Sequence, residues 1–177
     1  MPVTEAVPAR TVRRLLCSLQ APSSSRARSS PATVAALVRK LGYVQIDSIN
    51  VIDRAHHLIL GARLEGFEPR HLAHSLERSR KLFEHWTHDA CVIPTEWYPH
   101  WHHRFRRYAS KDRTNAWWRE RFGGNPSRVM RGVLERIRSD GALRARDFLP
   151  PGRTRSEPGG WWNWHPEKAA LEHLWRR

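Results

Sequence analysis

The sequence predicts a mainly α-helical fold with short strands, arranged as a winged helix-turn-helix that is truncated before its second wing. Three observations lead to this prediction. Apolar residues recur at helical spacing in several separate segments, and serine, proline or glycine stands at the ends of those segments. One short segment, 43–52, is rich in β-branched residues and predicts a strand or an extended turn. The last elements follow the order helix, tight turn, short helix, loop and helix.

Two amphipathic helices are predicted at the start of the chain. The first lies within residues 10–20, and a loop or linker rich in serine, proline and arginine follows it at 21–31. Ser30 is placed to cap the second helix, Pro31 to begin it and Gly42 to end it. The apolar stripes of these helices are Val12, Leu15, Leu16 and Leu19, and then Val34, Leu37, Val38 and Leu41.

The middle of the chain gives weaker patterns. Residues 70–80 predict a short basic helix. Residues 81–93 mix aromatic residues with histidines, and the pattern leaves their secondary structure open. Pro94 is expected to begin a helix that reaches about Arg107, and a second helical stretch is predicted over residues 111–122.

The Gly-Gly-Asn-Pro stretch at 123–126 predicts a domain boundary. It separates a helical, winged-helix-like domain at 1–122 from a partial winged helix-turn-helix at 126–177. The second domain is expected to hold an amphipathic helix that ends near Gly141, a short helix, and a last helix that begins at Pro166. The apolar stripes of its two long helices are Val129, Met130, Val133, Leu134 and Ile137, and then Ala170, Leu171, Leu174 and Trp175.

The charge of the chain favours a polyanionic partner. Lysine and arginine number 31 against 17 acidic residues, so the net charge is +14, and the sequence pI is about 11.3. The stretch 101–155 alone holds fifteen basic and five acidic residues, a net charge of +10. Codon bias toward arginine would explain the choice of arginine over lysine, but not this excess. We expect the stretch to follow the DNA backbone, with contacts from Arg128, Arg131, Arg144, Arg146, Arg153 and Arg155.

Membrane and disulfide-rich classes do not fit the sequence. No apolar run reaches the length of about 18 residues that a membrane span needs, and the N-terminal residues lack the apolar centre of a secretory signal. Cys17 and Cys91 lie far apart and suit a reducing compartment. We therefore expect a cytoplasmic, nucleoid-associated protein.

Four blocks of sequence, in this order along the chain, resemble the YcaQ/AlkZ family of bacterial DNA glycosylases, which unhook interstrand crosslinks. They are LGYVQIDSINVIDRAHHLIL, KLFEHWTHDACVIP, SDGALRARDF and GGWWNWHPEKAALEHLW. Members of the family are longer and carry further winged-helix and β-rich parts, so the resemblance implies that this chain is an N-terminal portion. Thr87 and Asp89 stand where alanine and glutamate are expected, and Asn163 replaces an acidic residue.

The resemblance assigns the catalytic Gln-x-Asp motif of the family to Gln45 and Asp47. In an extended segment these two side chains point the same way while Ile46 points into the core. An amide can orient a water, and a carboxylate can accept its proton or stabilise an oxocarbenium ion. The spacing alone also fits a turn in which Asp47 accepts backbone N–H bonds. The resemblance further places His88 near the site, where it would help to position DNA or a base.

The activity implied by the resemblance is hydrolysis of the N-glycosidic bond of an alkylated or crosslinked purine in double-stranded DNA. N7-alkylguanine is cationic and leaves without a general acid, so no metal or organic cofactor is expected. The alternative is a non-catalytic winged-helix DNA-binding fragment of such an enzyme. A third hypothesis, that the chain is a regulator which binds a small ligand and DNA, is supported only by the helix-turn-helix order of its last elements. The oligomeric state stays open.

Histidines and tryptophans form two further groups. The spacing of His85, His88 and Asp89 would put two metal ligands on one helical face, but a structural site needs further ligands, and Cys91 is the only nearby thiol. We therefore predict no metal site. The second group is Trp161, Trp162 and Trp164. These tryptophans could stack on DNA bases, or they could form a hydrophobic clamp that packs the second domain against the first. The clamp is the preferred interpretation.

Overall fold

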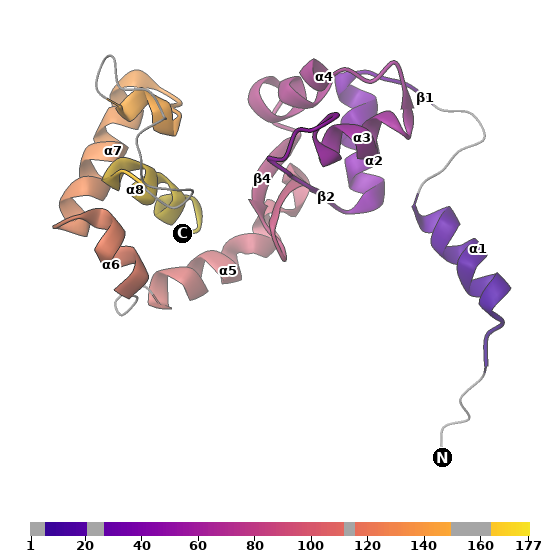
Figure 1. Cartoon of the computed structure of the whole chain (residues 1–177), viewed down its shortest axis with the longest axis horizontal. Helices are drawn as coiled ribbons and strands as arrows, with labels where there is room; N and C mark the ends of the chain where they lie inside the picture. Colours follow the sequence, from indigo (N-terminus) through magenta and orange to yellow (C-terminus); the bar gives the residue numbers. More distant parts are fainter. Residues whose placement is uncertain (1–5, 21–26, 112–115, 150–163) are drawn as a thin grey trace. The chain divides into compact units, whose positions relative to one another are not determined.

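A computed structural model shows a mainly helical chain with two small β-sheets, as the sequence predicted (Figure 1). The residues that it describes are 6–20, 27–111, 116–149 and 164–177. The chain divides into two compact units, Met1–His100 and Trp101–Arg177, and each is treated separately below. None of the described helices is both long and apolar enough to cross a membrane.

The two helices predicted at the start of the chain are present. All residues of α1 (Ala9–Leu19) are exposed. The second helix, α2 (Pro31–Leu41), begins with a capping box: Ser30 Oγ accepts from the Thr33 N–H at 3.2 Å, and Thr33 Oγ1 accepts from the Ser30 N–H at 2.8 Å. Gly42 ends α2 with a φ of 91°, a conformation that favours glycine.

Three strands of the first unit form an antiparallel sheet in the order β2-β5-β4. They are β2 (Val44–Gln45), β4 (Leu82–Trp86) and β5 (Ala90–Pro94). The segment whose structure the sequence left open is therefore a β-hairpin. The helix predicted from Pro94 begins later, because Pro94 pairs with Leu82 in the sheet. It starts as the 3₁₀ turn η2 (Thr95–Trp97) and continues as α5 (Tyr98–Lys111).

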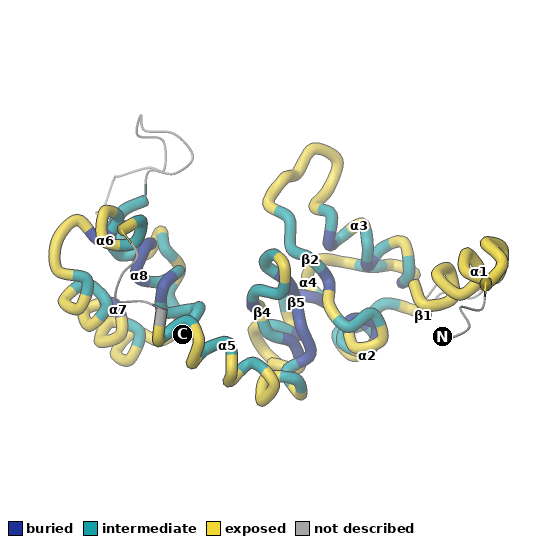
Figure 2. Tube along the Cα trace, turned by 90° about the horizontal axis from the view of Figure 1, so that it is seen from below, coloured by how far each residue is buried: buried dark blue, intermediate teal, exposed yellow. Residues whose placement is uncertain are grey.

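Short helices complete the first unit. They are α3 (Ala55–Gly61) and α4 (Pro69–Ala73), which continues as the π-helical turn η1 (His74–Arg78). A two-stranded parallel sheet joins β1 (Ala27–Arg28) to β3 (Leu64–Glu65). Figure 2 shows buried stretches of α2 and β5 in dark blue. One cluster of buried residues from α2, β2, α3, β3, α4, β4 and β5 forms the core of the unit: Val34, Leu37, Val38, Val44, Leu60, Leu64, Leu72, Leu82 and Val92.

The second unit contains the helices predicted for the end of the chain. They are α6 (Ala116–Phe122), α7 (Pro126–Asp140), the 3₁₀ turn η4 (Ala145–Phe148) and α8 (Pro166–Trp175). Asn125 caps α7 by accepting from the Arg128 N–H at 3.2 Å. The core of the unit is formed by Phe122 of α6, Val133 of α7 and Ala170 of α8.

The packing of α6 bears on two sequence expectations for the second unit. The chain divides at residues 100 and 101 rather than at 123–126, because α6 packs with α7 and α8 in one unit. The Trp164 ring lies 5.4 Å from the Trp117 ring of α6, so this tryptophan packs against a helix that the sequence assigned to the first domain, as the clamp requires. Trp161 and Trp162 lie outside the described residues.

Candidate active site

The Gln-x-Asp motif lies where β2 meets the β4–β5 hairpin. Gln45 is the last residue of β2 and pairs with Cys91 of β5. The Ile46 N–H donates to the Ala90 carbonyl at 2.8 Å, which extends the pairing by one residue, and the Ile46 side chain packs against the core as predicted. The sheet thus fixes the backbone on the N-terminal side of Asp47.

The amide of Gln45 is oriented by the hairpin turn. His88 Nε2 donates to Gln45 Oε1 at 3.1 Å, and Gln45 Nε2 donates to Asp89 Oδ2 at 3.5 Å, which is long for a hydrogen bond. His88 donates a hydrogen bond and the Asp89 carboxylate accepts one, so the amide oxygen of Gln45 must face His88 and the amide nitrogen must face Asp89. One N–H and one lone pair of the amide stay available to a water or a substrate.

The orientation of His88 is itself fixed by a short chain of side chains. Thr87 Oγ1 lies 3.1 Å from His88 Nδ1 and 3.0 Å from Cys91 Sγ, within hydrogen-bond distance of both. Burial raises the pKa of the Cys91 thiol, which keeps the thiol protonated and able to donate. Gln45 Oε1 can only accept, so the contact with His88 places a proton on Nε2, toward Gln45. Thr87 and Asp89, the two departures from the family pattern in this block, both belong to this network.

Asp47 begins an exposed loop between β2 and α3, drawn mostly in yellow in Figure 2. Its Oδ1 accepts from the Ile49 N–H at 2.8 Å, so the turn that the spacing allowed is present. Among the described residues, no hydrogen bond joins Asp47 to Gln45. The two side chains are held by separate contacts, and both are only partly buried.

A buried histidine of α3 holds the backbone at Asp47. The Asp47 N–H donates to His56 Nδ1 at 3.2 Å, and His56 is 5% exposed. Burial, together with the neighbouring His57 and Arg54, lowers the pKa of His56 to about 4. Sequence reasoning missed this role of His56, because no local pattern links it to a residue nine positions earlier.

The next histidine has a different partner. His57 Nδ1 lies 2.9 Å from Asp53 Oδ1, which also accepts from the Arg54 N–H at 2.7 Å. The hydrogen bond with His57 is the main cause that lowers the pKa of Asp53. Asp53 is exposed, so this pair closes the loop at its surface and lies apart from the Gln45 network.

The proposed metal spacing does not form a metal site. His85 is 2% exposed within β4, whereas His88 is exposed in the hairpin turn, so the two do not share a helical face. The described part of the chain contains no group of three or more histidine, cysteine, aspartate or glutamate side chains placed to hold an ion.

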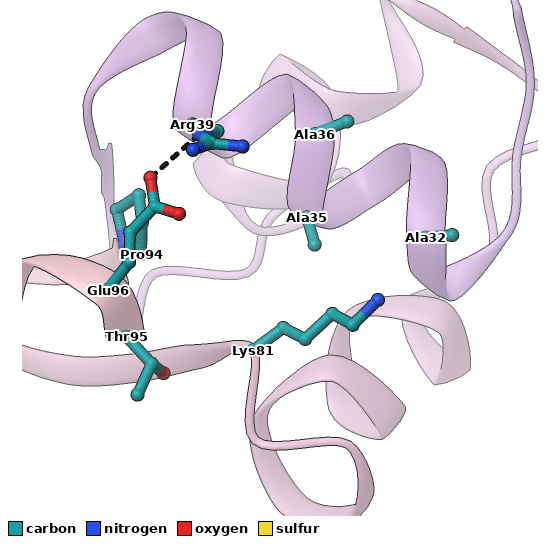
Figure 3. Close-up of a pocket in the computed structure, with 8 residues that line it drawn as sticks. All are labelled: Ala32, Ala35, Ala36, Arg39, Lys81, Pro94, Thr95 and Glu96. Carbon is teal, nitrogen blue, oxygen red and sulfur yellow. Dashed lines mark ion pairs between the residues drawn. The ribbon is translucent and has the colours of Figure 1, made fainter.

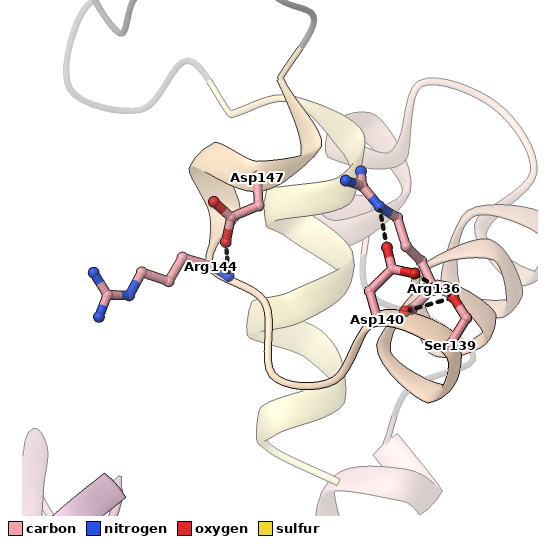
Figure 4. A network of polar contacts seen from close by, with 5 residues as sticks. All are labelled: Arg136, Ser139, Asp140, Arg144 and Asp147. Atoms are coloured by element: carbon pink, nitrogen blue, oxygen red, sulfur yellow. Dashed lines mark hydrogen bonds and ion pairs between the residues drawn. The ribbon is translucent and has the colours of Figure 1, made fainter.

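Exposed arginines line the second unit. At about 100° per residue, Arg128 and Arg131 lie on the face of α7 opposite the buried Val133. Arg144 and Arg146 are also exposed, in and beside η4. Figure 4 shows the Arg144 guanidinium pointing away from the Asp147 carboxylate, which accepts from the Arg144 backbone N–H. The other two arginines predicted to bind DNA, Arg153 and Arg155, lie outside the described residues.

A shallow hollow of about 390 Å³ lies at the opposite end of the hairpin from Gln45. Alanines of α2 line one side, and the ion pair between Arg39 and Glu96, with N···O of 2.7 Å, crosses it (Figure 3). Lys81 reaches toward α2 from the start of β4. The hollow lies at Pro94, the last residue of β5, whereas Gln45 pairs with Cys91 near the start of that strand. The hollow is therefore not part of the Gln45 site.

Comparison with known families agrees with the resemblance seen in the sequence. The model of the family described as DNA glycosylase AlkZ-like matches residues 38–177, which include the whole Gln45 network and α3. The chain belongs to the AlkZ-like DNA glycosylase family. No solved structure gives a significant match to this AlkZ-like chain.

Proposed function

We propose that this chain hydrolyses the N-glycosidic bond of an N7-alkylated or crosslinked purine in duplex DNA, with Gln45 and Asp47 as its catalytic residues. One observation carries the proposal: His88 and Asp89 orient the Gln45 amide, and the partly exposed carboxylate of Asp47 follows two residues later. The chain that holds this arrangement belongs to a DNA glycosylase family. The family supports glycosylase chemistry in general, and the site supports this particular division of roles.

The chemistry requires one water and one anion. The C1′–N9 bond breaks, its electron pair neutralises the cationic base, and N7-alkylguanine leaves without protonation. Asp47 stabilises the oxocarbenium ion that develops on the sugar. The available N–H and lone pair of Gln45 orient a water toward C1′, the new C1′–O bond forms, and the water proton passes to Asp47.

We also propose that each unit contributes a winged-helix arrangement to DNA binding. In the first unit, α2, β2, α3, α4, β4 and β5 follow one another with strand order β2-β5-β4, and the hairpin turn would be its wing. In the second unit, α7, η4 and α8 would form the helix-turn-helix. Its exposed arginines, Arg128, Arg131, Arg144 and Arg146, would contact phosphates.

A non-catalytic DNA-binding role is the second candidate. One observation favours it: Asp47 Oδ1 already accepts from the Ile49 N–H, which is what a purely structural turn would require. In that case the network around Gln45 stabilises the hairpin, and the chain binds duplex DNA without releasing a base.

Release of N7-methylguanine from methylated duplex DNA, measured under single-turnover conditions, tests the proposal. Asp47→Asn removes the charge at nearly constant shape and is expected to slow release about 10²–10⁴-fold, while the Kd for DNA changes only a few-fold. Asp53→Asn is the matched control, because it makes the same change on an exposed residue of the same loop. Activity that Asp47→Asn leaves intact refutes the site, and firm binding without release by the unaltered chain favours the second candidate.

A further inference from the structure

The histidine beneath the Gln-x-Asp loop has a geometry that goes beyond packing. His56 is the second residue of α3, it is 5% exposed, and its Nδ1 lies 3.2 Å from the Asp47 backbone nitrogen. A backbone N–H can only donate, so Nδ1 must be the acceptor and carry no proton. His56 is therefore neutral, with its proton on Nε2.

The contact is made at the point where the sheet ends. Ile46 is still held by the Ala90 carbonyl, whereas the residues after Asp47 run through the exposed loop. Asp47 is consequently held at two points: its N–H by His56, and its carboxylate by the Ile49 N–H. The first contact fixes the direction in which the side chain leaves the backbone, and the second fixes its rotation.

We infer that His56 is the positioning residue of this site, a neutral acceptor that holds Asp47 in place through the Asp47 amide. The inference rests on the proposed function, because Asp47 is the catalytic carboxylate there. His56 does not touch the substrate in this role. Its effect is on the rate of base release at saturating DNA, since a small displacement of a reacting group costs rate rather than binding.

The surroundings of His56 favour its neutral form, because the effects that lower its pKa outweigh those of two nearby carboxylates. His57 and Arg54 disfavour its protonation, as does burial, whereas Asp53 and Asp47 oppose them. Protonation would put an N–H on Nδ1 against the Asp47 N–H and break the contact. The geometry thus requires the neutral ring that these surroundings produce.

Two variants separate an acceptor from mere packing. His56→Phe keeps a ring but has no acceptor. His56→Asn places its Oδ1 where Nδ1 stands and restores the acceptor without a titratable group. His71→Phe is the matched control, since His71 is a partly buried histidine of α4 whose Nδ1 contacts Ser29 Oγ and not Asp47. The full chain is used throughout, and far-UV circular dichroism and a melt report whether each variant folds.

The first measurement does not depend on activity. Amide hydrogen exchange by NMR is expected to be severalfold faster at Asp47 in His56→Phe, and as slow as in the unaltered chain in His56→Asn and His71→Phe. The ¹⁵N spectrum of the imidazole is expected to show the Nε2–H form of neutral His56. Unchanged exchange at Asp47 in a folded His56→Phe, or a proton on Nδ1, overturns the inference.

The second measurement is the single-turnover release of N7-methylguanine. His56→Phe is expected to slow it about 10²-fold with the Kd for DNA within a few-fold, and His56→Asn to restore most of the rate. A folded His56→Asn that is as slow as His56→Phe overturns the inference. If His56→Phe does not fold, His56→Asn alone decides. Faster exchange of the Asp47 amide, or a large loss of rate, in folded His56→Asn then overturns the inference. If the unaltered chain releases no base, the proposed function fails, and the amide exchange still decides whether His56 holds Asp47.

Discussion

Gln45 Oε1 and His88 Nε2 lie 3.1 Å apart and share a hydrogen bond that ties the end of β2 to the β4–β5 turn. The two residues are 43 positions apart in the sequence. The orientation of the Gln45 amide therefore depends on the conformation of a turn that contributes no catalytic residue of its own.

Removing the His88 imidazole is expected to loosen Gln45 without unfolding the chain. His88 is exposed, so His88→Ala creates no buried cavity. The single-turnover rate of base release should fall about 10-fold, the effect of losing about 1.4 kcal/mol of positioning. His102→Ala removes an exposed histidine of α5 and serves as the control. Equal rates for the two variants would contradict the role given to His88.

Changing Asp89 to asparagine is expected to turn the Gln45 amide around. Asp89→Asn can still accept from the Ala90 N–H through Oδ1, but its amide nitrogen would face Gln45 Nε2. Two donors cannot bond to each other, and a reversed Gln45 would lose its bond from His88. The release rate should fall about 10-fold, again for about 1.4 kcal/mol, and the side-chain amide resonances of Gln45 should shift in ¹⁵N–¹H spectra. A wild-type rate with unshifted resonances would show that Asp89 does not orient Gln45.

His56 makes the stability of the fold depend on pH. Its pKa is lowered from 6.5 to about 4 in the folded chain, so the unfolded chain takes up the proton first as the pH falls. The stabilisation is complete above pH 6.5 and is lost between pH 6.5 and 4, by an amount of up to about 3 kcal/mol. His56→Asn lacks this proton. Its free energy of unfolding, from urea titrations across the same range, should fall less than that of the unaltered chain, while Asp53, whose pKa is lowered, contributes to both. Parallel curves would contradict the lowered pKa.

DNA binding is expected to follow the charge of the second unit. If about five phosphates are neutralised, the slope of log K against log salt should be near −4 to −5 for any duplex sequence. Reversing Arg128 and Arg131 to glutamate should weaken binding to all sequences alike and make the slope shallower, measured by fluorescence anisotropy. The same reversal at Arg10 and Arg13 of α1, which lie outside the family match, is the control. A flat slope in the unaltered chain would refute a phosphate-bound surface.

The sequence by itself determined the helices whose ends carry local signals. Ser30 and Pro31 begin α2, Asn125 and Pro126 begin α7, and Pro166 begins α8, because a cap or a fixed φ acts on residues within one turn of it. The family resemblance likewise lay in contiguous blocks, so the sequence alone assigned the Gln-x-Asp motif to Gln45 and Asp47.

Only the tertiary structure decided what surrounds those two residues. The segment 81–94 has no clear period of its own and becomes a hairpin because β2 pairs with β5 across more than forty residues. That pairing puts His88 and Asp89 against Gln45, and the packing of α3 puts His56 beneath Asp47. Such contacts depend on strand register and helix packing, which couple distant residues through burial and pairing energies. Local spacing contains no record of those energies, and for this reason it identified the helix caps but not the residues that contact Gln45 and Asp47.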